Sequence, residues 1–261
     1  MLIDTHSHPD RYGDPDSALG QIKGLGILTL ANSMDPASYL RNLDISRECE
    51  LVVPCFGIHP WNAPEHADRL AYLSRFVEQS PVLGELGLDF FFVKDASARP
   101  AQVKVLEFFL DAASQHDRLV ILHTKGAEAE VLRLLDAHGV RRAIIHWYSG
   151  PLDIMEDFLA RGACFTIGVE ALRPGPVQKI ARRIPDELLL TETDNPGGYE
   201  WLTGEPGTPG LIQDVVGALA RIRETTEERI IQTVHRNLGR LIRDDPMLSW
   251  VHERFFQTHE P

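Results

Sequence analysis

The chain has 261 residues, enough for one large domain with a substantial core, which we place at residues 1–261. Lysine and arginine number 26 against 38 aspartates and glutamates, and the formal net charge of −12 argues against a long basic grip on duplex DNA. Three scattered cysteines exclude a disulfide framework, and the sequence shows no signal-peptide pattern and no apolar run of the roughly 18 residues that a membrane span needs. We therefore expect a cytoplasmic protein without a membrane partner.

Apolar segments typical of strands alternate with helical segments along the whole chain. The expected strands are 2–8, 27–31, 51–58, 81–85, 119–123, 143–146, 163–167 and 188–191. The expected helices are 17–24, 35–49, 65–79, 101–116, 128–138, 152–160 and 177–183, with two or three more between 208 and 256. Such alternation predicts a parallel sheet. Eight units in about 250 residues predict an α/β fold, a (β/α)8 TIM-like barrel with additional C-terminal helices.

The first expected strand ends in the pattern His6-Ser7-His8. Alternate side chains of a strand point to the same face, so these two histidines project together. Neutral histidine is the commonest metal ligand among side chains. A pair of surface or half-buried histidines fits the spacing as well, so the pattern alone leaves both interpretations open.

In a (β/α)8 barrel the catalytic residues lie at the carboxyl ends of the strands. Six of the eight expected strands end in or lead into His, Glu or Asp. The candidate metal ligands among these residues are His6, His8, Glu85, His123, His146 and Asp194. Six ligands exceed the needs of one tetrahedral ion, so we expect two divalent ions with Glu85 as the bridge. Histidine-rich ligation favours Zn, Mn or Fe, and availability in the cell also admits Mg.

Two ions about 3.5 to 4 Å apart can hold an attacking hydroxide and stabilise a leaving oxygen, which serves phosphodiesters, esters and amides. We expect Glu85 and Asp194 to be catalytic, with Asp194 orienting or deprotonating the attacking water. His59 either caps the turn before Pro60 or binds substrate through a phosphate. Lys125 either points inward to an anionic substrate or is solvated.

Aromatic residues also follow the expected strands. Phe90, Phe91 and Phe92 come after the fourth strand; we interpret them as core residues, the alternative being a lid that stacks on bases. For Trp61, Trp147 and Trp201 we expect packing between loops.

Six motifs occur in the order in which a known family has them. They are Asp4-Thr5-His6-Ser7-His8, Gly57-Ile58-His59-Pro60, Leu83-Gly84-Glu85-Leu86-Gly87-Leu88-Asp89, Val120-Ile121-Leu122-His123-Thr124, Ile145-His146-Trp147 and Thr191-Glu192-Thr193-Asp194-Asn195-Pro196. Together they resemble the TatD family of metal-dependent hydrolases, among the amidohydrolase-like barrels. The resemblance implies a TIM-like barrel and a DNase, often a 3′ exonuclease on single-stranded DNA or RNA. It implies one ion on His6, His8, Glu85 and Asp194, and a second on Glu85, His123 and His146.

The chain departs from many relatives at the substrate rim. Trp147-Tyr148 stands where many have Cys-Phe, Lys125-Gly126 where many have a basic residue and Asp, and Asn195 where many have Ser. The expected substrate is single-stranded DNA or DNA ends, and the expected state a monomer. The alternative is a metal-dependent ester or amide hydrolase, such as a D-aminoacyl-tRNA deacylase. A non-catalytic partner-binding barrel is disfavoured because all six candidate ligands are present.

Overall fold

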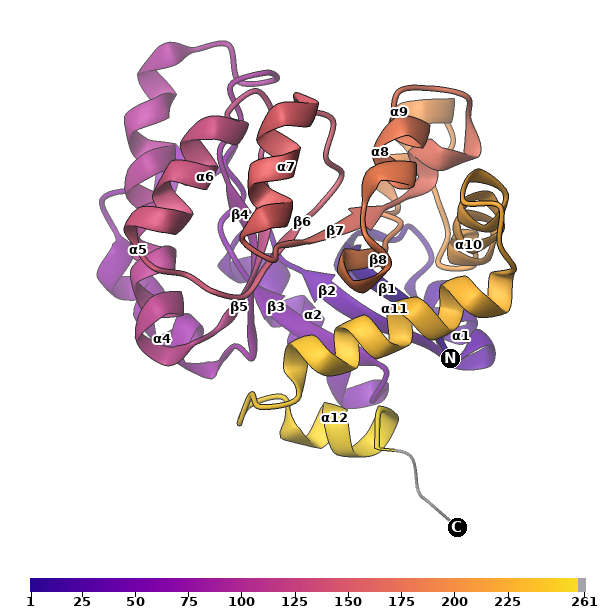
Figure 1. Cartoon of the computed structure of the whole chain (residues 1–261). Helices are drawn as coiled ribbons and strands as arrows, with labels where there is room; N and C mark the ends of the chain where they lie inside the picture. Colours follow the sequence, from indigo (N-terminus) through magenta and orange to yellow (C-terminus); the bar gives the residue numbers. More distant parts are fainter. Residues whose placement is uncertain (258–261) are drawn as a thin grey trace.

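The computed structural model describes residues 1–257. Within them, eight parallel strands lie side by side in chain order and form the barrel that the sequence predicts (Figure 1). The strands are β1 (Leu2–Ser7), β2 (Ile27–Asn32), β3 (Val52–Phe56), β4 (Val82–Gly87), β5 (Leu119–His123), β6 (Ala143–Ile145), β7 (Cys164–Ile167) and β8 (Leu189–Thr191). Because all the strands are parallel, their carboxyl ends meet at one end of the barrel.

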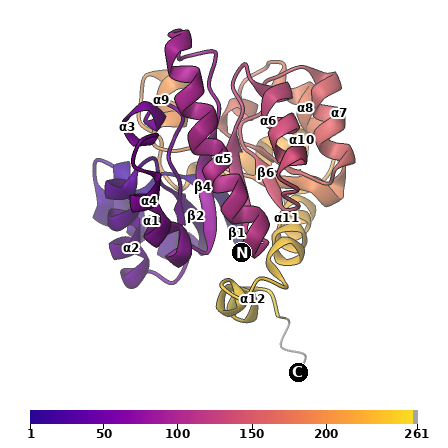
Figure 2. The same cartoon turned by 90° about the vertical axis from the view of Figure 1, so that its left-hand side faces the viewer.

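Helices connect the strands and cover the outside of the barrel (Figures 1 and 2). Those before β8 are α1 (Pro15–Leu25), α2 (Pro36–Glu48), α3 (Ala63–His66), α4 (Leu70–Gln79), α5 (Arg99–His116), α6 (Glu128–Ala137), α7 (Leu152–Ala160) and α8 (Val177–Arg183). After β8 come α9 (Gly197–Thr203), α10 (Leu211–Ile222), α11 (Glu227–Ile242) and α12 (Ser249–Phe255). None of the helices in residues 1–257 is both long and apolar enough to cross a membrane.

Two helical predictions are wrong. The segment expected as one helix over 65–79 forms α3 and α4, which residues 67–69 separate. The large buried side chains of the segment, Leu73, Phe76 and Val77, all follow Leu70. Before Leu70 only the small Ala67 is buried, so little apolar surface continues the helix toward the core. Helix α9 lies where no helix was expected, because it starts with two glycines, and glycine has a low helix propensity.

An aromatic cluster fixes β3 to the helices outside it. Phe56 of β3 lies with its ring centroid 5.1 Å from Tyr39 of α2, 5.1 Å from Phe76 of α4 and 5.6 Å from Phe109 of α5. Aromatic pairs at such distances add to the free energy gained by burial. The cluster therefore holds the strand that leads to His59.

Side-chain hydrogen bonds join β1 to β8 and bring the first and last strands together. Thr5 Oγ1 donates to Thr191 O (2.9 Å), and Thr191 Oγ1 donates to Ile3 O (2.6 Å). The Asp4 carboxylate accepts hydrogen bonds from Thr193 N (3.0 Å) and Thr193 Oγ1 (2.7 Å). This seam sets the position of the segment after β8 relative to the end of β1.

The strand register shifts at two places, between Asp4 and Ser7 in β1 and between Leu83 and Leu86 in β4. His6 and Glu85 lie inside these irregular stretches. Irregularities of this kind turn a side chain toward a new direction. Next to the second one, Gly57 lets the chain approach β4 closely, because a Cβ atom there would lie 2.3 Å from Glu85 O.

Candidate metal centre

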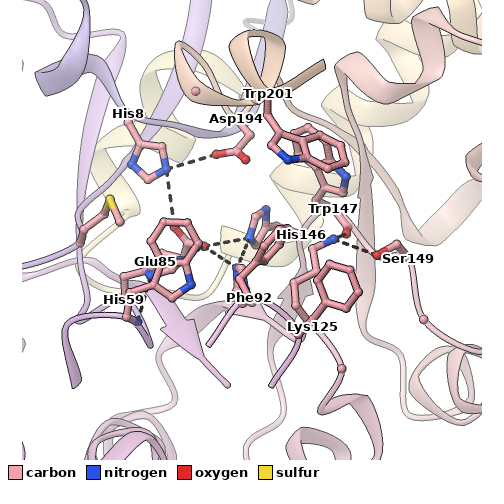
Figure 3. Close-up of a pocket in the computed structure, with 18 of the residues that line it drawn as sticks. His8, His59, Glu85, Phe92, Lys125, His146, Trp147, Ser149, Asp194 and Trp201 are labelled. Carbon is pink, nitrogen blue, oxygen red and sulfur yellow. Dashed lines mark hydrogen bonds and ion pairs between the residues drawn. The ribbon is translucent and has the colours of Figure 1, made fainter. Parts of the chain in front are cut away.

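The six predicted ligands gather at the carboxyl ends of the strands, beside a cavity of about 1080 Å³. Five of them line the cavity (His8, Glu85, His123, His146 and Asp194), and the sixth, His6, is fully buried. His59 and Lys125, predicted to bind substrate, line the same cavity (Figure 3). All eight predicted side chains therefore lie in one place, although the strands that position them are spread along the chain.

The Glu85 carboxylate lies at the centre of the cluster. Its Oε1 atom faces three imidazoles, at 2.9 Å from His146 Nε2, 3.0 Å from His123 Nδ1 and 3.3 Å from His59 Nε2. Its Oε2 atom faces the other two, at 3.4 Å from His6 Nε2 and 3.5 Å from His8 Nε2. Each oxygen thus belongs to a different group of nitrogens, which is the arrangement that a bridging carboxylate requires.

Asp194 completes the group around Oε2. Its Oδ1 atom lies 3.2 Å from His8 Nε2 and 3.5 Å from His6 Nε2, and the Asp194 amide donates to His6 O (2.8 Å). The backbone of Asp194 has a positive φ of 54°, a conformation that aspartate and asparagine adopt more readily than most residues. Residues held in such a conformation often lie in functional sites.

The partner of the remote ring nitrogen determines which nitrogen of each histidine is free to bind a cation. His8 Nδ1 lies 3.0 Å from Asn32 O, and His123 Nε2 lies 3.1 Å from Asp89 Oδ2. His146 Nδ1 lies 3.6 Å from Glu192 Oε2. In His8 and His123 the remote nitrogen is hydrogen-bonded to an oxygen acceptor, so in the neutral ring the other nitrogen, next to Glu85, keeps its lone pair. The His146 contact is longer than a hydrogen bond.

His59 has the opposite arrangement. Its Nδ1 atom accepts a hydrogen bond from Trp61 N (3.2 Å), so in the neutral ring the proton resides on Nε2. That Nε2–H points at Glu85 Oε1. His59 is therefore arranged as a hydrogen-bond donor, although its distance to Glu85 and His123 would also allow a shared cation.

The donor set fits divalent cations. Three triplets each offer ligand atoms within 4.8 Å of one another: His6 with Glu85 and His146, His6 with His8 and Asp194, and His59 with Glu85 and His123. Among the described residues, neither ring nitrogen of buried His6 has a hydrogen-bond partner. A buried imidazole without partners beside two carboxylates is costly unless a cation satisfies it. Mixed nitrogen and oxygen ligation of this kind suits Zn, Mn or Fe.

The charges of the cluster oppose its burial. Burial disfavours ionised Glu85, but His59, His146 and His6 outweigh it and hold its pKa well below the usual range. Burial likewise opposes charge on Asp194, yet His8 and His6 lower its pKa. Burial also disfavours the charged form of His8, but Asp194 and Glu85 raise its pKa to about 9. The two carboxylates are therefore ionised at neutral pH.

Two acidic residues that sequence reasoning did not assign support the imidazoles. Asp89 Oδ2 accepts from Trp61 Nε1 (2.7 Å) as well as facing His123, and Glu192 Oε1 accepts from Trp147 N (2.9 Å). Both are fully buried. Both also belong to the motifs Leu83–Asp89 and Thr191–Pro196, so their place beside predicted ligands was the signal that could have identified them.

A third acidic residue, Glu170, follows β7 and was not predicted as a site residue from the sequence. Its buried Oε2 atom has no hydrogen-bond partner among residues 1–257, and burial together with nearby Glu192 raises the pKa of Glu170 to about 7. No motif surrounds Glu170, so the sequence carries no comparable signal for it.

The rim of the cavity is partly as predicted. Lys125 points inward, where its Nζ atom donates to Trp147 O and to Ser149 Oγ (3.0 Å), and burial lowers its pKa. Trp147 packs between loops and is buried, as expected. The interpretation of Phe91 and Phe92 as core residues is wrong, since both are exposed on the loop after β4. Their neighbour Phe90 is partly buried against the core.

Comparison with known proteins identifies the family of the chain. The family model described as TatD related DNase matches residues 3–243. The 3'-5' ssDNA/RNA exonuclease TatD of Dickeya dadantii is 31% identical over 202 residues, covering 72% of this chain and 75% of that protein. An uncharacterized metal-dependent hydrolase of Bacillus subtilis is 24% identical and covers 93% of this chain and 99% of its own length. The crystal structure of a TatD homologue from Escherichia coli superposes with a TM-score of 0.84 at 25% identity, covering 92% of this chain and 97% of that one.

Proposed function

Because the chain belongs to the TatD-related DNase family and is a metal-dependent hydrolase, we propose that it hydrolyses phosphodiester bonds at the ends of single-stranded DNA with two divalent ions. The observation that carries the two-ion proposal is the Glu85 carboxylate, whose two oxygens face two different groups of imidazoles. The exonuclease named above supports the choice of strand ends. The net charge of −12 supports a local contact rather than a long grip on a duplex.

The residues divide between the two ions as follows. His6, His8 and Asp194 would hold one ion, and His123 and His146 the other, with one oxygen of Glu85 on each. Two such ions supply charge neutralisation at the scissile phosphate and a water acidic enough to attack it at neutral pH. Zn, Mn and Mg are the candidates, of which the histidines favour the first two.

The side chains of the chain itself provide proton transfer and orientation. Asp194 is ionised and faces the cavity, so its carboxylate can accept the proton of the attacking water. His59 Nε2–H can donate to a non-bridging phosphate oxygen. The Lys125 ammonium, held by Trp147 O and Ser149 Oγ, can offset the charge of the substrate.

The first test measures metal-dependent shortening of an end-labelled single-stranded oligonucleotide. Metal-stripped protein receives Mg, Mn or Zn in turn, with Asp194→Asn as the matched variant, since asparagine also tolerates a positive φ. Shortening from one end that requires metal and disappears in the variant supports the proposal. Labels at the 5′ and 3′ ends in separate reactions give the polarity.

Failure with every ion would overturn the nuclease proposal and favour ester or amide hydrolysis. The same preparations would then be assayed for release of the amino acid from D-aminoacyl-tRNA. We also propose that the chain acts as a monomer in the cytoplasm and forms one domain. The three cysteines, Cys49, Cys55 and Cys164, are free and buried, which suits a reducing compartment.

A further inference from the structure

Five aromatic side chains line one continuous part of the cavity. They are Trp61, Phe91, Phe92, Trp201 and Trp147, and we call them the aromatic arc. They come from the loops after β3, β4 and β6 and from α9, so the arc joins segments that are distant in sequence. Figure 3 shows three of them, Phe92, Trp147 and Trp201, around the same cavity as the candidate metal ligands.

The rings contact one another edge to face. Trp61 and Phe92 have centroids 6.1 Å apart, Phe92 and Trp201 6.5 Å, and Trp201 and Trp147 6.1 Å. Nevertheless Trp201 is 66% exposed, Phe91 55% and Trp61 50%. These side chains touch each other without forming a core. Apolar surface left in contact with water beside a polar centre is typical of a binding site.

The Asp89 side chain fixes three of the five residues of the arc. Its Oδ1 atom accepts hydrogen bonds from the amides of Phe91 (3.0 Å) and Phe92 (2.7 Å), and its Oδ2 atom accepts from Trp61 Nε1 (2.7 Å). The same Oδ2 atom faces the imidazole of His123. One buried carboxylate therefore positions both a candidate metal ligand and three of the five aromatic residues of the arc.

Positive charge is scarce around this cavity. Arg11 and Lys125 are the lysine and arginine side chains that line it within residues 1–257, and Lys125 is already hydrogen-bonded to Trp147 and Ser149. Lys94, whose Nζ atom lies 4.7 Å from the ring centroid of Phe91, adds one cation beside the arc. A nucleic acid thus finds few phosphate contacts beyond the metal centre. Stacking of bases on aromatic rings contributes about 1–3 kcal/mol per base and tolerates every base.

We propose that the aromatic arc is a base-stacking subsite that receives the unpaired bases at the strand end being cut. The inference rests on the proposed function and adds what selects its substrate. A duplex covers the faces of its bases with neighbouring pairs, so the arc favours single strands and frayed ends over paired ones. Recognition through ring faces also predicts little preference among base identities.

The test uses the metal-loaded protein and compares two oligonucleotide substrates of equal length and charge. One carries its natural bases, and the other has abasic residues at the last three positions of both ends. The double variant Phe92→Leu with Trp201→Leu keeps apolar bulk but removes two rings, while Phe92→Tyr with Trp201→Phe retains rings. Trp250→Leu, on α12 at the other end of the barrel, is the control for loss of an exposed tryptophan.

For the natural substrate, we expect the leucine pair to raise KM about tenfold or more with kcat within about twofold. The ring-retaining pair and Trp250→Leu stay close to the parent protein. The abasic substrate shows the raised KM already in the parent protein, and the leucine pair adds nothing to it. If the arc had only a structural role, the leucine pair would instead change KM for both substrates alike.

Two results would overturn the inference in different ways. Equal KM values for natural and abasic substrates, with metal-dependent cleavage of both, would remove the stacking subsite and leave the proposed nuclease function intact. Absence of cleavage of both substrates with every ion would remove the nuclease function and the subsite together.

Discussion

The inner and outer layers of the cavity are built in different ways. The inner layer consists of imidazoles and carboxylates from strand ends, and it is buried apart from the face of Asp194 that lines the cavity. The outer layer is the aromatic arc, which stands on loops and α9 and is largely exposed. The inner layer is held by the register of the strands and by the seam between β1 and β8. The outer layer is held mainly through Asp89.

This difference assigns the reaction to the inner layer and substrate selection to the outer layer. Strand ends in a barrel converge on one point, so a metal centre there is rigid, whereas loops can change without disturbing it. We therefore expect inner-layer substitutions to act on kcat and metal content, and outer-layer substitutions to act on KM.

The largest effect should come from Glu85→Gln. The amide nearly preserves the shape but removes the negative charge shared by five imidazoles, so we expect turnover below detection and loss of at least one bound ion. Activity assays and metal analysis of the purified protein, with circular dichroism to confirm folding, measure this. Phe92→Leu in the outer layer is the matched comparison and should keep kcat. Turnover by Glu85→Gln would contradict the assignment of the reaction to the inner layer.

Next in size is the contrast between His8→Ala and His59→Ala. In the neutral rings His8 presents a lone pair to the cavity and His59 an N–H, so we expect only His8→Ala to lose metal. His59→Ala should keep its metal and lose roughly 10²-fold in kcat, the usual loss for one hydrogen-bond donor at a developing charge. His59→Gln, whose amide can donate a hydrogen bond, should recover part of the lost kcat. Loss of metal in His59→Ala would instead make His59 a ligand.

A smaller effect is expected from Asp89→Asn, which touches both layers. Loss of the charge that orients His123 should weaken metal affinity or activity about 10- to 100-fold, and loosening of the arc should raise KM as well. Metal titration and steady-state kinetics separate the two effects. Asp95→Asn, an exposed residue on the same loop, is the control. A change in KM alone would show that His123 does not depend on Asp89.

The smallest effect concerns the pH dependence of stability in the metal-free protein. The pKa of folded Glu170 is about 7, above its ordinary value of 4.5, so the folded state binds this proton more tightly than the unfolded state. The stabilisation is complete below about pH 4.5 and is lost as the pH rises through about 7. In Glu170→Gln the free energy of unfolding should fall less between pH 5 and 8, by on the order of 1–3 kcal/mol.

Thermal melts of the metal-free protein between pH 5 and 8 measure that difference. Exposed Glu48→Gln on α2 serves as the control and should follow the parent curve. Burial raises the pKa of the neighbouring Glu192 to about 7 as well, so an unchanged slope in Glu170→Gln would show that Glu192 rather than Glu170 binds the proton in the folded protein.

The sequence by itself determined the barrel and the identity of the inner layer. Strand and helix periodicities are local, and the rule that strand ends converge turned His6, Glu85 and Asp194 into one predicted cluster. Even the bounds of β5, α7 and α8 agree with the predicted ranges 119–123, 152–160 and 177–183. Local patterns sufficed because each candidate ligand lies at or just after the end of a strand, His6 and His8 sharing the first, and needs only the fold to bring it to the others.

Only the tertiary structure decided which atoms of these residues are available and what surrounds them. The free nitrogen of His8 depends on Asn32, 24 residues away, and that of His123 on Asp89, 34 residues away. The exposure of Phe91 and Phe92 likewise depends on loops from other strands, and α9 forms despite its two glycines. Hydrogen-bond partners and ring contacts join residues distant in sequence, and no local period records them, because they arise only when the barrel closes.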